Sequence, residues 1–164
     1  MPRSLPALVL FLFAVAANAG EITGRVVGVS DGGTITVLSG TRVKIRLDGI
    51  RCPENGQPYG QNAKEFTSAV AYRTIVTVRA KGRDRSGHTL GEVILMDGRN
   101  LNRELVRMGL GWWSRKEAPN DRELARLEAE ARAARIGLWA DPDPVPPWEW
   151  GKAKRPPTSS GTGR

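Results

Sequence analysis

Arginine, carboxylate and histidine side chains are the residues of this chain whose types allow chemistry on an anion. Arg51 carries a planar guanidinium that can bind two oxygens of a phosphate group at once, and a salt bridge to Glu54 or Asp48 is the alternative that we favour. His88 is the single histidine. Histidine titrates at about pH 6.5 in model peptides, so His88 could act as a general acid, or have no role as an exposed loop residue.

Metal binding is the second kind of chemistry to consider. Cys52, Glu54 and His88 are of types that bind zinc, but their positions show no recognisable ligand spacing. Asp48 lies on the same face of a predicted strand as Arg46, and we expect an ion pair between them rather than a displaced metal ligand. These residues therefore predict no metal site.

Cys52 is the single cysteine of the chain. No disulfide can form within one chain, so stability must come from packing. We expect Cys52 to pack as a small hydrophobic residue; a reactive thiol and a link between two chains are the alternatives.

The stretch Val29-Ser30-Asp31-Gly32-Gly33-Thr34-Ile35-Thr36-Val37 combines a turn with a strand. Asp31-Gly32-Gly33 has the permissive backbone of a tight reversal, and residues 34–37 alternate polar and apolar at β-branched positions. Gly33 can therefore be a turn residue, or the place of a side chain that is missing.

The first 19 residues have the composition of a secretion signal. A basic Arg3 precedes the apolar run Leu5–Ala16, and Ala17-Asn18-Ala19 is a small-x-small cleavage signal. The run is shorter than the roughly 20 apolar residues that span a bilayer; an uncleaved anchor is the alternative. We expect residues 1–19 to be cleaved, leaving a secreted or periplasmic protein without a stable membrane anchor.

Positive charge gathers at the other end of the chain. The formal net charge is +8, and residues 151–164 contain four basic residues and no acid, so the domain itself is only mildly basic. The composition of this segment predicts a disordered basic tail that attracts nucleic acid or another polyanion weakly and in a salt-sensitive way.

Five strands and three helices follow from the residue patterns between these ends. Alternating β-branched runs predict strands over 21–29, 34–38, 41–50, 75–81 and 90–96. Apolar residues at helical spacing predict helices over 61–71, 101–108 and 121–136, the last capped by Asn120. We expect one α+β domain over residues 20–150, a small five-stranded barrel with about three packed helices.

The last predicted feature of the domain is a proline-rich segment with two tryptophans. Trp148 and Trp150 follow Pro144, Pro146 and Pro147. If the segment is extended, both rings point the same way and could stack on bases. We expect them instead to clamp the end of the domain against the barrel.

Several separated motifs, taken in order and with their spacing, resemble the staphylococcal nuclease (thermonuclease) family. They are Asp31-Gly32-x-Thr34, Arg46-Leu47-x-Gly49-Ile50, Cys52-Pro53-Glu54, Asp84-Arg85-x-Gly87 and Gly137-Leu138-Trp139. The resemblance covers residues 20–150 and implies an oligonucleotide-binding (OB) barrel.

The resemblance also implies roles for site residues. Family members bind Ca²⁺ through two aspartates and a backbone carbonyl, activate water with a glutamate and hold the phosphate with two arginines. Gly33 and Arg51 stand where the two aspartates would be. Arg46 and Glu54 match the first arginine and the glutamate, and His88 replaces the second arginine. Ser114 and Glu117 lie in the loop where family members commonly place tyrosines that line the nucleotide pocket.

Loss of both aspartates argues against calcium at the family position. Two unit charges about 4 Å apart interact with an energy of about 4 kcal/mol at an effective dielectric of 20, and the energy doubles when one of them is a divalent ion. Arg51 would repel a Ca²⁺ ion at this position, and the single carboxylate of Glu54 cannot offset both this repulsion and the loss of the two aspartates. We therefore expect no Ca²⁺ and no other cofactor.

Three hypotheses for function remain. The first is a monomeric, non-catalytic module that binds nucleic acid or another polyanion, with Arg46, Arg51 and Arg85 as its binding residues. The second is a metal-independent phosphodiesterase with Arg46, Glu54 and His88 as catalytic residues, Glu54 as base and His88 as acid. The third is a protein-interaction domain, whose binding would depend little on salt.

Overall fold

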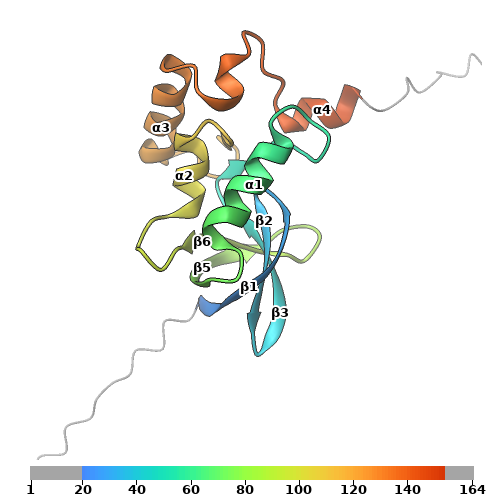
Figure 1. Ribbon diagram of the computed structural model, residues 1–164, viewed down its shortest axis with the longest axis vertical. Helices are drawn as coiled ribbons and strands as arrows, with labels where there is room; N and C mark the ends of the chain where they lie inside the picture. Colours follow the sequence, from blue (N-terminus) through green and yellow to red (C-terminus); the bar gives the residue numbers. More distant parts are fainter. Residues whose placement is uncertain (1–19, 154–164) are drawn as a thin grey trace, which may run out of the picture.

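The computed structural model describes residues 20–153 (Figure 1). The predicted signal segment 1–19 and residues 154–164 of the predicted tail lie outside the described residues. Among the residues that are described, no helix has the length and apolar character needed to cross a bilayer.

A closed five-stranded barrel forms the centre of the domain, which confirms the predicted α+β barrel. Its strands follow the order β1-β2-β3-β6-β5, with β5 closing on β1. All neighbours are antiparallel except β3 and β6, which run parallel. The barrel strands are β1 (Glu21–Asp31), β2 (Thr34–Ser39), β3 (Thr41–Leu47), β5 (Ile75–Arg83) and β6 (Thr89–Ile94). This mixed, closed topology is OB-like.

Every second side chain along the strands points into the barrel and fills its interior. Ile45 and Leu47 of β3 are buried and Arg46 between them is only partly so, because successive side chains of a strand point to opposite faces. Ile35 of β2 faces Ile45 in the register of the two strands. Strand pairing thus presents the Arg46 side chain on the outer face of a packed core.

The predicted strand 41–50 is in fact two strands. β3 ends at Leu47, and β4 (Ile50–Arg51) pairs with β7 (Trp112–Trp113) in a separate two-stranded sheet. Gly49 between them has φ 74°, a left-handed conformation that favours glycine. The chain therefore turns away from the barrel at Asp48-Gly49, and Arg51 leaves the face that a continuous strand would give it.

The described residues also form four α-helices and one 3₁₀ helix. They are α1 (Gly60–Ala71), α2 (Leu101–Arg107), α3 (Arg122–Ala133), η1 (Gly137–Ala140) and α4 (Pro147–Ala153). Of these, α1 and α2 contact the barrel strands and α3 packs on α2. In Figure 1 the strands fill the lower half of the view, and α2, α3 and α4 lie in the upper half. The predicted cap of α3 was wrong by one residue, since Asp121 and not Asn120 accepts the N–H of Leu124, at 2.9 Å.

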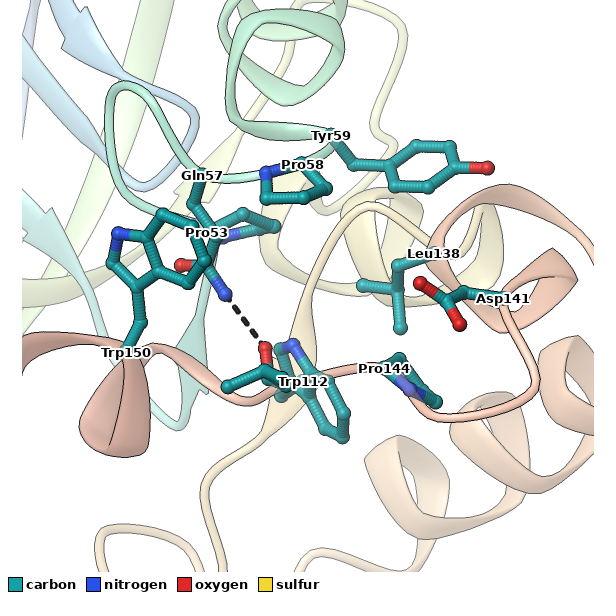
Figure 2. Close-up of a pocket in the computed structure, with 10 residues that line it drawn as sticks. Pro53, Gln57, Pro58, Tyr59, Trp112, Leu138, Asp141, Pro144 and Trp150 are labelled. Carbon is teal, nitrogen blue, oxygen red and sulfur yellow. Dashed lines mark hydrogen bonds between the residues drawn. The ribbon is translucent and has the colours of Figure 1, made fainter. Parts of the chain in front are cut away.

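The segment with Trp148 and Trp150 at the end of the domain is helical and not extended. α4 begins at Pro147, a residue that suits the first turn because it needs no N–H there. The segment before it is held by the buried Gln57, whose Nε2 donates to the carbonyl of Val145 at 2.6 Å (Figure 2). Trp112, Leu138 and Trp150 line the small hollow around this bond.

Asn102 of α2 ties the helix to the barrel and to the turn after β3. It is 2 % exposed. Its side chain accepts from the N–H of Val93 at 3.1 Å and donates to the carbonyls of Asp48 and Gly91, at 2.9 and 3.2 Å. One buried amide thus fixes where the chain turns between β3 and β4.

Replacing Asn102 by alanine is expected to lower the free energy of unfolding by about 2–4 kcal/mol, because three largely buried hydrogen bonds are lost. Urea unfolding followed by tryptophan fluorescence measures the change. Asn55→Ala is the matched control: its single side-chain bond, to the carbonyl of Ser30, is exposed, and we expect less than about 0.5 kcal/mol. Equal losses in the two variants would contradict this role of Asn102.

Candidate functional site

Two open hollows meet at Arg46 and Arg51. The first, of about 460 Å³, is lined on its other sides by the β1–β2 turn with Asp31 and Gly33 and by the segment after β4 with Glu54. The second, of about 450 Å³, lies on the other side of the two arginines and is lined by Arg83, Arg85, Lys116 and Glu117, among others. Of the predicted site residues, Arg46, Arg51, Glu54 and Arg85 therefore line these two adjoining hollows.

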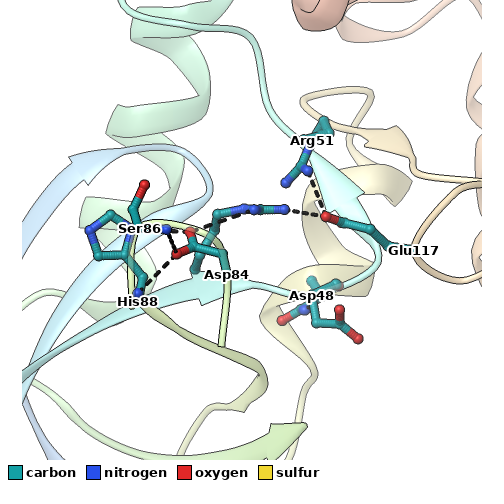
Figure 3. A network of polar contacts seen from close by, with 8 residues as sticks. Asp48, Arg51, Asp84, Ser86, His88 and Glu117 are labelled. Atoms are coloured by element: carbon teal, nitrogen blue, oxygen red, sulfur yellow. Dashed lines mark hydrogen bonds and ion pairs between the residues drawn. The ribbon is translucent and has the colours of Figure 1, made fainter. Parts of the chain in front are cut away.

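Glu117 joins the two arginines (Figure 3). Its Oε1 accepts a hydrogen bond from Nη2 of Arg46 and another from Nη2 of Arg51, the latter at 2.5 Å. Arg46 comes from β3, Arg51 from β4 and Glu117 from the loop after β7, so three separate segments converge on one carboxylate oxygen. We call this arrangement the arginine clasp.

The clasp replaces two predicted ion pairs. Arg51 pairs with Glu117 rather than with Glu54 or Asp48, so the predicted partners were wrong. The predicted Asp48–Arg46 pair was also wrong: Asp48 lies 3.5 Å from Nζ of Lys81, because the turn at Asp48-Gly49 carries its side chain away from the outer face of β3.

Burial raises the pKa of Glu117. Desolvation is the main cause, the Arg46 charge opposes it, and repulsion from Asp48 adds to it. The side chain is 17 % exposed. Glu117 is thus an acid held between two cations in a position where its charged form is poorly solvated.

The loop between β5 and β6 is organised around Asp84. Asp84 Oδ1 accepts the N–H groups of Ser86 and His88 at 2.8 and 2.9 Å, and Oδ2 lies 3.1 Å from Nδ1 of His88 (Figure 3). Arg46 Nη1 lies 3.6 Å from the same Oδ2. Burial opposes ionisation, but the hydrogen bonds from His88 and Ser86 outweigh it and lower the pKa of Asp84.

His88 is therefore a partner of Asp84 and not a lining residue of either hollow. The predicted general acid contacts Asp84, which lines the second hollow, whereas Glu54 lines the first. In this geometry His88 positions Asp84, which in turn contacts Arg46.

The turn at Gly33 has room for a side chain. A Cβ added at Gly33 would lie 3.6 Å from Sγ of Cys52 and 3.7 Å from Oδ1 of Asp31, which is ordinary contact. The neighbouring Gly32 is different, because a Cβ there would lie 2.5 Å from Cβ of Ala63 on α1. Close packing therefore requires glycine at position 32 and does not require it at position 33.

Cys52 forms part of the floor beside Gly33. Burial, and secondarily the charge of Asp31, raises the pKa of its thiol far above the ordinary value. The thiol stays protonated at neutral pH and packs against the core, as the packing interpretation predicts.

Within residues 20–153, no group of three or more histidine, cysteine, aspartate and glutamate side chains is placed to hold a metal ion. Cys52 and Glu54 line the same hollow, but His88 does not join them. The carboxylates of that hollow, Asp31 and Glu54, share it with two guanidiniums. Oδ1 of Asp31 already accepts the N–H of Gly33 at 2.8 Å.

Glu117 and Asp84 are site residues that the sequence did not predict. Glu117 lay in the loop where the family resemblance implies tyrosines, and nothing in its local sequence indicates partners 66 and 71 positions away. Asp84 had a usable signal, since an aspartate followed by Ser86-Gly87 is typical of a turn that its own side chain stabilises.

This sequence matches a nuclease family and proteins that are named as nucleases. The family described as "Staphylococcal nuclease homologue" matches residues 44–141. An "Uncharacterized endonuclease" of Escherichia coli O157:H7 is 42 % identical over 151 residues, covering 92 % of this chain and 97 % of the relative. A "Micrococcal nuclease" of Shigella flexneri is 35 % identical over 167 residues, covering 96 % and 95 %.

Alanine at position 33 should be tolerated and alanine at position 32 should not. We expect Gly33→Ala to change the free energy of unfolding by less than about 1 kcal/mol, because the new methyl group meets only ordinary contacts. Gly32→Ala should cost about 1–3 kcal/mol through overpacking against α1. Thermal unfolding of both variants measures the difference, and a larger loss in Gly33→Ala would show that the turn itself needs glycine there.

Proposed function

This chain belongs to the staphylococcal nuclease homologue family, and we propose that it binds the phosphate backbone of nucleic acid at the arginine clasp without hydrolysing it. The observation that carries the proposal is the clasp itself. Arg46 and Arg51 share one oxygen of an anion, and a non-bridging phosphate oxygen has the same need for two charge-assisted hydrogen bonds. In the unbound protein, Glu117 supplies that anion.

The surroundings of the clasp support a polyanion rather than a single small anion. Arg83, Arg85 and Lys116 line the second hollow beside it. The β1–β2 turn and the β5–β6 loop border the two hollows, and the corresponding loops of OB folds bind oligonucleotides. A chain of phosphates could thus follow the groove past several cations.

Calcium does not fit this donor set. Ca²⁺ takes about 6–8 oxygen ligands, and the residues at the two family aspartate positions are Gly33, without a side chain, and Arg51, a cation. Glu54 and Asp31 remain, facing two guanidiniums in the same hollow. This supports the proposal that the calcium centre of the family is lost and that Arg51 meets the phosphate directly.

Hydrolysis without a metal is the second candidate function. Glu54 lines the same hollow as both arginines, so it could take the proton of an attacking water, and relatives are named nucleases. The contact of His88 with Asp84, outside the hollow that Glu54 lines, weakens this candidate, because the leaving oxygen would need another acid.

Binding is tested by fluorescence anisotropy with a dye-labelled single-stranded oligonucleotide. We expect Arg51→Ala to weaken binding about tenfold or more, since a charge-assisted hydrogen bond contributes roughly 1.5–3 kcal/mol. Arg126→Ala removes the same charge from an exposed position on α3, where Arg126 pairs with Glu123 and Glu130, and should change little. Affinity should fall as salt rises. Weak binding that ignores salt would contradict the proposal and favour a protein partner.

Hydrolysis is tested with the same strands in Ca²⁺ and in EDTA. We expect the natural protein to cleave neither DNA nor RNA, and the double variant Gly33→Asp with Arg51→Asp to gain calcium-dependent cleavage. Cleavage by the natural protein that persists in EDTA and disappears in Glu54→Gln would instead establish the metal-independent enzyme.

Glu117 should make binding depend on pH. The ionised carboxylate competes with phosphate for both arginines, and its raised pKa means that protonation begins at a higher pH than in free glutamate. We therefore expect affinity to rise as pH falls from 7 towards 5. Glu117→Gln should bind about tenfold more tightly at pH 7 and show a flatter profile.

The other charged groups around the clasp are present both in the natural protein and in Glu117→Gln. Asp84 and His88 face Arg46, and Asp48 acts on Glu117. The lowered pKa of Asp84 keeps it ionised over this range. The difference between the two profiles thus reports Glu117, and parallel profiles would contradict its competition with phosphate.

A further inference from the structure

A third hollow adjoins the arginine clasp on the side of α4. It has a volume of about 440 Å³ and is lined by Arg51, Trp113, Ser114, Arg115, Lys116 and Trp148. Arg51 and Lys116 also line the second hollow, so the two hollows are neighbours. Among the described residues, the lining of this hollow contains two indole rings and three cations and no carboxylate.

Both indole rings are held in place from behind. Trp148 packs edge-to-face against the buried Trp112, with ring centroids 5.8 Å apart. Trp113 donates its Nε1–H to the carbonyl of Ala118 at 2.8 Å, and the guanidinium of Arg115 lies 4.6 Å from its ring centre. A ligand would therefore meet a pre-formed surface and would not have to order these side chains.

Trp148 nevertheless stays accessible. It is 46 % exposed, whereas Trp112 and Trp139 are below 8 %. Trp148 thus lines the third hollow and keeps nearly half of its surface accessible. Proteins that bind single-stranded nucleic acids commonly place an exposed aromatic side chain beside cations. A base can then stack on the ring while its phosphate contacts the positive charges.

We propose that the hollow between Trp148, Trp113 and Arg115 is a subsite for an unpaired nucleobase of a single strand, stacked on Trp148 with its phosphate at Arg51 and Lys116. The proposal rests on the proposed function, since it extends the same strand by one nucleotide past the clasp. A base in a duplex is stacked between its neighbours and could not enter, so the subsite favours single strands.

An abasic strand separates base binding from phosphate binding. Fluorescence anisotropy would compare a short oligothymidylate with a strand of equal length that carries the same phosphates and sugars but no bases. We expect the natural protein to bind the oligothymidylate about tenfold more tightly. Trp148→Ala should lose that preference and leave the abasic strand unaffected, whereas Arg51→Ala should weaken both.

Two controls keep the result interpretable. Trp148→Phe retains a ring that can still pack on Trp112, so it should keep most of the preference even if alanine loosens α4. Tyr72→Ala removes another exposed aromatic, 44 % exposed and outside the three hollows, and should change nothing.

The outcomes distinguish the two proposals. If neither strand binds, the proposed function is wrong. If both strands bind equally well and Trp148→Ala has no effect, phosphate binding stands and the base subsite is wrong. A duplex that competes as well as the single strand, with the same dependence on Trp148, would also overturn the subsite.

Discussion

Two like charges brought together need an anion between them, and this constraint organises the site. Arg46 and Arg51 come from strands of two different sheets, and Glu117 lets their guanidiniums approach by sharing one oxygen. Burial disfavours the charged carboxylate and raises the pKa of Glu117, although the Arg46 charge opposes this effect. Glu117 therefore holds the two guanidiniums around a position that suits an anion.

The turn at Asp48-Gly49 makes this meeting possible. A strand that continued to residue 50 would keep Asp48 and Arg46 on the same face, and Arg51 on the opposite one. The break sends Asp48 to Lys81 and allows Arg51 to reach Glu117. Asn102 holds the carbonyl of Asp48 from the side of α2, so a buried amide in the core stabilises the geometry of a surface site.

The fold could be predicted from the sequence and the partners within the site could not. Apolar and polar residues alternate along β2, β3 and β5, and apolar residues recur at helical spacing along α1 and α3. These patterns are local, and they predict the strands of the barrel and the helices. Arg51 and Glu117 lie 66 positions apart, so their pairing depends on how β4 meets β7, which no local pattern encodes. The helix at Pro147 was missed because prolines indicate an extended segment unless one of them occupies the first turn.

Cys52 has a practical consequence for work on this molecule. Its thiol is protonated and packed beside Gly33, so it is a poor nucleophile towards alkylating reagents and oxidants. It is also the single cysteine of the chain. A cysteine introduced at an exposed position would then be the one fast-reacting thiol, and maleimide dyes or spin labels could be attached at a chosen point of the groove without removing the native residue.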